Sequence, residues 1–201
     1  MDETKLTEEI FLKDVKAHTL KIIKDDGLYR HLRCSRDNSS TMFFDIVTWP
    51  GNLAYTGDMG SFMFSRIEDM FCFFRSDKLK INTGYWAEKV MAESIFGNGV
   101  REFSIEAFHE AVIHSAKTYL DLEENENVPS EIMDEIHCLL TAEDEHSCIE
   151  EMRNFCSDKI EFNDFWEYSL NRKTWYYVWC CYAIVWAIMK YDEAKGNITS
   201  K

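Results

Sequence analysis

The sequence predicts an α+β protein with an N-terminal helix, a small antiparallel β-meander and a mainly helical C-terminal half. Two observations lead to this expectation. Between residues 28 and 65, four short runs rich in aromatic and β-branched side chains are separated by turn residues. On both sides of that region, apolar residues recur at helical spacing. With 46% hydrophobic residues among 201, the chain can form a substantial core, and we expect residues 1–80 and 81–201 to pack as one unit.

Residues 7–25 are predicted to form the N-terminal helix. Thr7 can act as its N-cap, and Glu8 and Glu9 suit the positive end of a helix dipole. The apolar face of this helix would comprise Ile10, Phe11, Val15, Leu20 and Ile23. Turn chemistry in Asp25-Asp26-Gly27 ends the element.

The β-meander is predicted from the runs 28–35, 42–49, 52–56 and 61–65. The sequences between them are rich in Asn, Asp, Ser, Gly and Pro, which favour turns. Connections this short join antiparallel neighbours, so we expect three or four strands. Arg30, Arg33 and Arg36 lie along the first run, which would form an edge of the sheet.

The rest of the chain is predicted to be helical, apart from an exposed loop at 121–128. The expected helices are 67–74, 85–95, 104–120, 130–140, 142–155, 163–170 and 173–192. The last one carries an aromatic stripe at helical spacing: Trp175, Trp179, Tyr182 and Trp186. Its opposite face is apolar too, which is typical of a buried core helix. The alternatives are a stacking surface for bases or a protein interface, including that of a homodimer.

The formal charge of −14 is distributed unevenly along the chain. Residues 1–90 have a net charge of −1, whereas residues 91–201 have a net charge of −13. Residues 121–151 alone contain 12 acidic side chains and no Lys or Arg. Such a surface would repel phosphates, so the charge argues against direct binding of nucleic acid and favours a partner with a basic surface.

The acidic segment 121–151 is therefore the first candidate binding site. Clustered carboxylates can steer a cationic partner and occupy Arg and Lys side chains that would otherwise hold DNA or RNA. The alternative is a solvated face that keeps the chain in solution, which is the more usual role of a charge run. The candidate residues are Asp121, Glu123, Glu124, Glu126, Glu131, Asp134, Glu135, Glu143, Asp144 and Glu145.

A second candidate site lies near the meander. Arg30, His31, Asp45 and Asp58, with Arg33, could form a small polar site for a nucleotide or another anion. With this site, the chain would be a small-molecule-binding or nucleotide-binding protein or a hydrolase. The alternative for Asp58 is turn chemistry, because Gly57-Asp58-Met59-Gly60 has the composition of a tight turn. The glycine-rich phosphate motifs and the GxSxG nucleophile elbow are all missing from the sequence.

Three acid–histidine pairs have the spacing of a helical metal site: Glu106/His109, Asp134/His137 and Glu143/His146. With 36 acidic residues, such pairs arise frequently by chance. We therefore expect no metal and no cofactor, and the missing catalytic motifs favour a function that is not enzymatic.

The sequence predicts a cytoplasmic protein. Its first residues lack the basic and apolar regions of a secretory signal, and the seven cysteines show no CxxC pattern. The longest uncharged stretch, Thr174–Met189, has sixteen residues, fewer than the roughly 20 that a membrane-spanning helix needs. Free thiols in a reducing compartment and no membrane segment are the expectation.

Residues 31–75 resemble a block found in uncharacterised proteins of enterobacterial phages and prophages. The segments that carry the resemblance are Phe44–Gly51, Tyr55–Gly60 and Phe64–Arg66, and the Trp- and Tyr-rich C-terminal helix with Tyr191-Asp192 fits it. The resemblance covers less than half of the chain and implies no catalytic residues. It implies an accessory phage protein, a setting in which inhibitors of bacterial defence, such as anti-CRISPR proteins, are common. We therefore expect an inhibitor that binds a host defence complex through the acidic segment.

Overall fold

The structure, a computed structural model, describes residues 6–37, 39–95 and 99–196. Its contacts divide the chain into two compact units. The sheet unit comprises Met1–Val100 and Lys173–Lys201, and the helical unit comprises Arg101–Arg172. These units do not follow the expected ranges 1–80 and 81–201, because the C-terminal helix belongs with the sheet. Two parts of these sequence predictions lie outside the described residues. They are residues 1–5, at the start of the segment that lacks the features of a secretory signal, and Asn38 in the first predicted turn.

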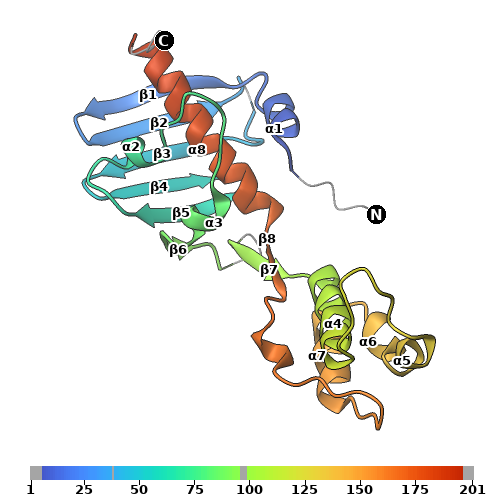
Figure 1. The fold of residues 1–201 in the computed structure, drawn as a ribbon. Helices are drawn as coiled ribbons and strands as arrows, with labels where there is room; N and C mark the ends of the chain where they lie inside the picture. The colour runs from blue at the N-terminus through green and yellow to red at the C-terminus, as the bar shows by residue number, and fades with distance from the viewer. Residues whose placement is uncertain (1–5, 38, 96–98, 197–201) are drawn as a thin grey trace. The chain divides into compact units, whose positions relative to one another are not determined.

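An antiparallel sheet of six strands in sequential order forms the first unit (Figure 1). The strands are β1 (Thr19–Asp26), β2 (Tyr29–Ser35), β3 (Phe44–Trp49), β4 (Asn52–Gly57), β5 (Gly60–Ser65) and β6 (Val90–Glu93). The four predicted strands correspond to β2 to β5, and the sheet has one further strand at each side. The α+β fold class is thus confirmed, with a larger meander than expected.

The predicted helix over residues 7–25 is wrong in its second half. Helix α1 (Glu8–Asp14) starts where predicted, with the Thr7 hydroxyl accepting a hydrogen bond from the Ile10 N–H. Residues 19–26 instead form β1, which pairs with β2. In this strand Leu20 and Ile22 pack against the core, whereas Ile23, which the expected helical face included, is exposed. The alternation of buried and exposed side chains is that of a strand. Consequently β2 lies inside the sheet and is not its edge.

A second correction concerns residues 85–95, which were predicted to be helical. They contain the end of helix α3 (Thr83–Ala87) and then the edge strand β6. Strand β6 pairs with β5 through Phe64↔Val90 and Met63↔Ala92. Helix α2 (Met70–Phe74) lies within the predicted 67–74 segment and contributes Phe71 and Phe74 to the core.

Helix α8 (Trp175–Ala194) lies across one face of the sheet (Figure 1). Its predicted burial is confirmed, because eleven of its residues are buried, including Trp179, Cys180 and Tyr191. The Trp179 ring meets the rings of Phe11 and Phe44 edge-on, at centroid distances of 5.1 and 5.8 Å. A role of α8 in a dimer stays a prediction. Within the described parts of the chain, the helices are too short or too polar to span a bilayer.

The helical unit has its own core. It contains α4 (Ile105–Tyr119), α5 (Ser130–Glu135), α6 (His137–Leu140), α7 (Glu145–Asn154) and a 3-10 turn, η1 (Phe165–Glu167). Strands β7 (Arg101–Phe103) and β8 (Asn171–Lys173) pair at its ends. The predicted helix at 104–120 is confirmed, whereas 130–140 is split into α5 and α6, and 163–170 contains only the 3-10 turn. Residues 121–128 form the predicted loop, largely exposed.

Candidate functional site

The helical unit carries the entire net charge of the protein. Its range contains 19 acidic and 5 basic side chains, which gives −14, whereas the sheet unit contains 17 acidic and 17 basic side chains. The division of charge therefore follows the division into compact units. The sheet unit has no net charge, whereas the helical unit is strongly negative and has its own hydrophobic core.

The acidic candidates are on the surface of the helical unit. Nine of the ten are exposed, and Glu135 is half-buried. They are distributed over the 121–128 loop, α5 and the start of α7. The helices and loop that carry them are held by buried apolar residues such as Phe108, Ile136 and Leu139. The carboxylates thus project from ordered elements.

Three of these ten carboxylates have structural roles. Glu135 pairs with Lys159 at 3.0 Å, and this contact lowers the pKa of Glu135. Asp144 caps α7 by accepting the Ser147 N–H at 2.9 Å, which lowers the pKa of Asp144. Glu126 accepts the Glu123 N–H at 2.7 Å and closes the loop. These intramolecular bonds account for the acidic side chains at the three positions, and no partner molecule is needed to explain them.

The other seven candidates form no ion pair with any residue that the structure describes. They are Asp121, Glu123, Glu124, Glu131, Asp134, Glu143 and Glu145. Their side chains are exposed, so an external cation can approach them without breaking an existing salt bridge. This availability of charge is the feature of the segment that bears most on function.

The acid–histidine pairs do not assemble a metal centre within the described residues, where no group of three or more His, Cys, Asp or Glu side chains could hold an ion. Glu106 instead accepts a hydrogen bond from the Ser104 hydroxyl at 2.9 Å. Ser104 in turn caps α4 by accepting the Ala107 N–H.

On the sheet unit, the structure brings together part of the second candidate site. Arg33 and Asp45 are register partners on β2 and β3. The Asp45 carboxylate lies 2.8 Å from His31 Nε2 and accepts two hydrogen bonds from the Arg33 guanidinium, at 2.8 and 3.2 Å. Asp45 is only 7% exposed, although it lies on the face of the sheet opposite the buried Leu32. Its burial is explained by the two cationic or polar side chains that cover it.

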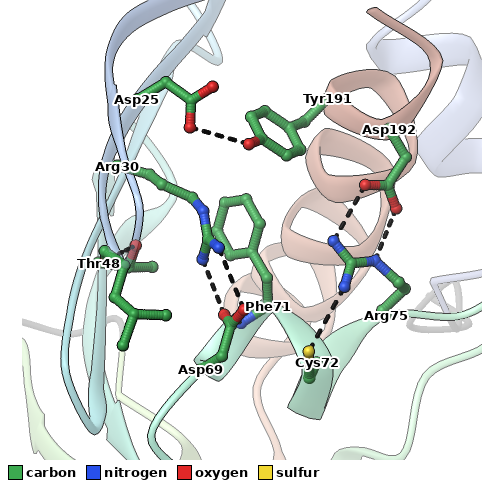
Figure 2. A network of polar contacts seen from close by, with 10 residues as sticks. Asp25, Arg30, Thr48, Asp69, Phe71, Cys72, Arg75, Tyr191 and Asp192 are labelled. Carbon is green, nitrogen blue, oxygen red and sulfur yellow. Dashed lines mark hydrogen bonds and ion pairs between the residues drawn. The ribbon is translucent and has the colours of Figure 1, made fainter. Parts of the chain in front are cut away.

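Arg30 lies on the other face of the sheet. Adjacent residues of a strand point to opposite faces, so Arg30 cannot join His31. Figure 2 shows its guanidinium directed at Asp69, with bonds of 2.7 and 3.1 Å, and above the ring of Phe71, 4.5 Å from its centroid. Asp58 is also engaged elsewhere, because it accepts the Met42 N–H at 2.8 Å. The turn interpretation of Asp58 is consistent with this bond.

A hollow of about 360 Å³ adjoins the Arg33 end of this cluster. Its lining is Arg33, Ser35, Ser39, Ser40 and Phe43. The Arg33 guanidinium lies 5.4 Å from the centroid of the Phe43 ring. The serines were missed as site residues because a run of Asp, Asn and Ser between two strands indicates only a turn. Hydroxyls, a guanidinium and an aromatic ring are groups that can hold an anion with a planar part.

The His31–Asp45 pair resembles the orienting half of a catalytic triad, but the other half is missing from the described residues. Within them, no Ser, Thr or Cys side chain is hydrogen-bonded to His31. A general base acts on a nucleophile within hydrogen-bond reach. The structure thus shows how Asp45 orients the His31 ring and shows no nucleophile bonded to it among the described residues.

Further polar contacts fasten the end of α8 to the sheet and to α2 (Figure 2). The Tyr191 hydroxyl donates to Asp25 at 2.9 Å, and the Arg75 guanidinium donates two bonds to Asp192 at 2.7 and 3.0 Å. Burial raises the pKa of Asp69, but its bonds with Arg30 and with the Phe71 N–H outweigh this effect, so the net pKa is lowered. These residues hold the fold together.

Comparison of the chain with protein-family models, curated proteins and solved structures finds no match.

Proposed function

We propose that this protein is a non-enzymatic, phage-encoded inhibitor of a bacterial defence system. It binds a basic, nucleic-acid-binding surface of a host protein complex through the acidic face of its helical unit. The observation that carries the proposal is the location of the whole net charge of −14 in residues 101–172. The phage setting comes from the sequence resemblance of residues 31–75.

Two physical arguments support the acidic face as the binding surface. A concentrated negative field accelerates the encounter with a cationic partner and disfavours nucleic acid itself. The seven unpaired carboxylates also enter such a complex without losing an intramolecular salt bridge. A defence nuclease or surveillance complex must present Arg and Lys to phosphates, and these side chains are the complementary groups.

The proposal is tested by expressing the chain in enterobacterial strains that each carry one defence system, and by measuring the plating efficiency of a sensitive phage. The wild-type protein is expected to restore plating in one strain. A variant with five amides in place of unpaired acids of the helical unit is expected to abolish this effect. Its substitutions are Glu123→Gln, Glu124→Gln, Glu131→Gln, Asp134→Asn and Glu143→Gln.

A matched control removes the same number of negative charges from exposed positions of the sheet unit. Its substitutions are Glu9→Gln, Asp26→Asn, Asp37→Asn, Glu68→Gln and Asp77→Asn. This variant is expected to protect the phage as well as the wild type does. If both variants protect equally, or if the wild type restores plating in none of the strains, the proposal is wrong.

A second candidate function, binding of a nucleotide or a similar small anion, is favoured by the hollow beside Arg33. Thermal unfolding in the presence of a nucleotide panel tests it, with Arg33→Gln as the site variant and Arg36→Gln as the control. A ligand of this site raises the melting temperature of the wild type and of the control but not that of Arg33→Gln. No shift with any nucleotide rejects this function.

A further inference from the structure

A groove of about 420 Å³ lies on the sheet unit, outside both candidate sites. It is formed by α1, the segment 78–80 and the C-terminal half of α8. Its volume falls within the roughly 300–1,000 Å³ typical of small-molecule sites. All of its lining residues belong to one compact unit, so its shape does not depend on the placement of the helical unit.

The floor of the groove is apolar. Trp186 and Leu79 lie in it with exposed fractions of 8% and 7%, and Met189 is half-buried beside them. Leu12 is 42% exposed here, although its neighbour Phe11 is completely buried. Covering these apolar side chains with a hydrocarbon removes them from water and lowers the free energy.

The rim of the groove is charged, with a small excess of cations. It carries three lysines and two glutamates, a net charge of +1. Lys190 is paired with Glu193 at 2.7 Å. Lys78 and Lys80 are exposed, and within the described chain they form no ion pair. The remaining acid, Glu8, lies in the first turn of α1, where the backbone N–H groups favour its charge. Two ammonium groups close together in sequence are therefore left for an external anion.

We propose that this groove binds a small amphipathic carboxylate with a single aliphatic chain. The hydrocarbon lies on Leu12, Leu79 and Trp186, and the carboxylate lies between Lys78 and Lys80. The ligand class follows from the combination of an apolar floor with two unpaired cations at one side of it. A neutral or cationic ligand with a chain of the same length contacts the apolar floor but forms no ion pair with Lys78 or Lys80.

The proposal is tested with the full chain and three ligands that differ only in their head group: decanoate, decan-1-ol and decylamine. Each is used at concentrations where it is fully dissolved as a monomer. The readout is the indole N–H signal of Trp186 in a proton–nitrogen correlation spectrum, identified by its loss in Trp186→Phe. Decanoate is expected to shift this signal in a saturable way. Its Kd is expected to be at least fivefold below those of the alcohol and the amine.

Charge variants then locate the carboxylate. Each exposed ion pair is worth up to about 1 kcal/mol, or about fivefold in affinity. Lys78→Gln with Lys80→Gln is thus expected to raise the Kd of decanoate about tenfold and to leave that of decanol unchanged, which also shows that the variant is folded. Lys16→Gln with Lys21→Gln, two exposed lysines outside the groove, is the control. The inference is overturned if decanoate causes no saturable shift, if all three ligands bind equally, or if the control weakens binding as much as the groove variant.

Discussion

Replacing Asp69 measures how much the polar contacts in Figure 2 stabilise the sheet unit. The Asp69 carboxylate makes two kinds of interaction: a paired contact with the Arg30 guanidinium and an N-cap bond to the Phe71 N–H at 2.9 Å. Asp69→Ala removes both of them. Asp69→Asn removes the charge but keeps a good capping side chain. The two variants therefore separate the ion pair from the cap.

The magnitude follows from burial. Removing one partner of a fully buried ion pair costs about 3–5 kcal/mol, whereas exposed pairs are worth about 0–1 kcal/mol. The side chains of Arg30 and Asp69 are 11% and 27% exposed, so we expect an intermediate cost of about 2–3 kcal/mol for Asp69→Asn. Arg30 is the more sensitive partner, because its Nε is buried and has no hydrogen-bond acceptor among the residues that the structure describes. Loss of the cap adds about 1 kcal/mol in Asp69→Ala.

Urea unfolding followed by tryptophan fluorescence is a suitable assay, because five of the six tryptophans lie in the sheet unit. The double variant Arg30→Met, Asp69→Asn removes both charges and is expected to be more stable than Asp69→Asn alone. The reasoning is refuted if Asp69→Asn costs less than about 0.5 kcal/mol, which would be typical of a solvated pair. Equal stabilities of Asp69→Asn and Asp69→Ala would refute the assigned role of the cap.

Three further predictions concern the same unit. The pKa of Asp69 is lowered in the folded state, so its carboxylate contributes fully to the free energy of unfolding above its ordinary pKa of about 4. This contribution is lost as the pH falls through the lowered pKa. The stability difference between wild type and Asp69→Asn, measured by urea unfolding, should therefore shrink below pH 4. In Gly57→Ala the new Cβ would lie 2.8 Å from Phe44 Cα, so thermal unfolding should show a loss of about 1–3 kcal/mol. Trp179→Ala should cost about 3–5 kcal/mol in urea, since the side chain is fully buried among aromatic rings.

The central strands were predictable from the sequence, whereas the outer strands were not. Strands β2 to β5 are bounded by turn residues and follow one another closely, so local signals specify them. Strand β1 contains Leu20, Ile22 and Ile23 together with two lysines, a pattern that fits a helix and a strand equally well. Pairing with β2 decides between the two, and pairing is a contact that no single segment encodes. The same holds for β6, which is only four residues long and pairs with β5 across α2 and α3.

For the candidate sites, the sequence predicted residue types better than their grouping. His31 and Asp45 do meet, as the second candidate site requires. Arg30 was assigned to the same site, although strand alternation already places it opposite His31. The groove at Leu12 and Trp186 had no sequence signal at all, because it joins segments that are more than 170 positions apart. Such a surface exists only once α8 has packed beside α1.

The separation of charge between the two units bears on why the acidic face exists. A protein that needs negative charge only for solubility can distribute it over its whole surface, which minimises repulsion. Here the opposite arrangement is found: the sheet unit has equal numbers of acidic and basic side chains, and the unit with the smaller core carries all of the net charge. Concentrated like charges destabilise the compact state that bears them. Seven carboxylates that form no ion pair with the described residues thus weaken the helical unit in isolation, and under the proposed function a basic partner would reverse that cost on binding. The proposed binding of a basic partner predicts this concentration of charge, whereas a role in solubility alone does not require it.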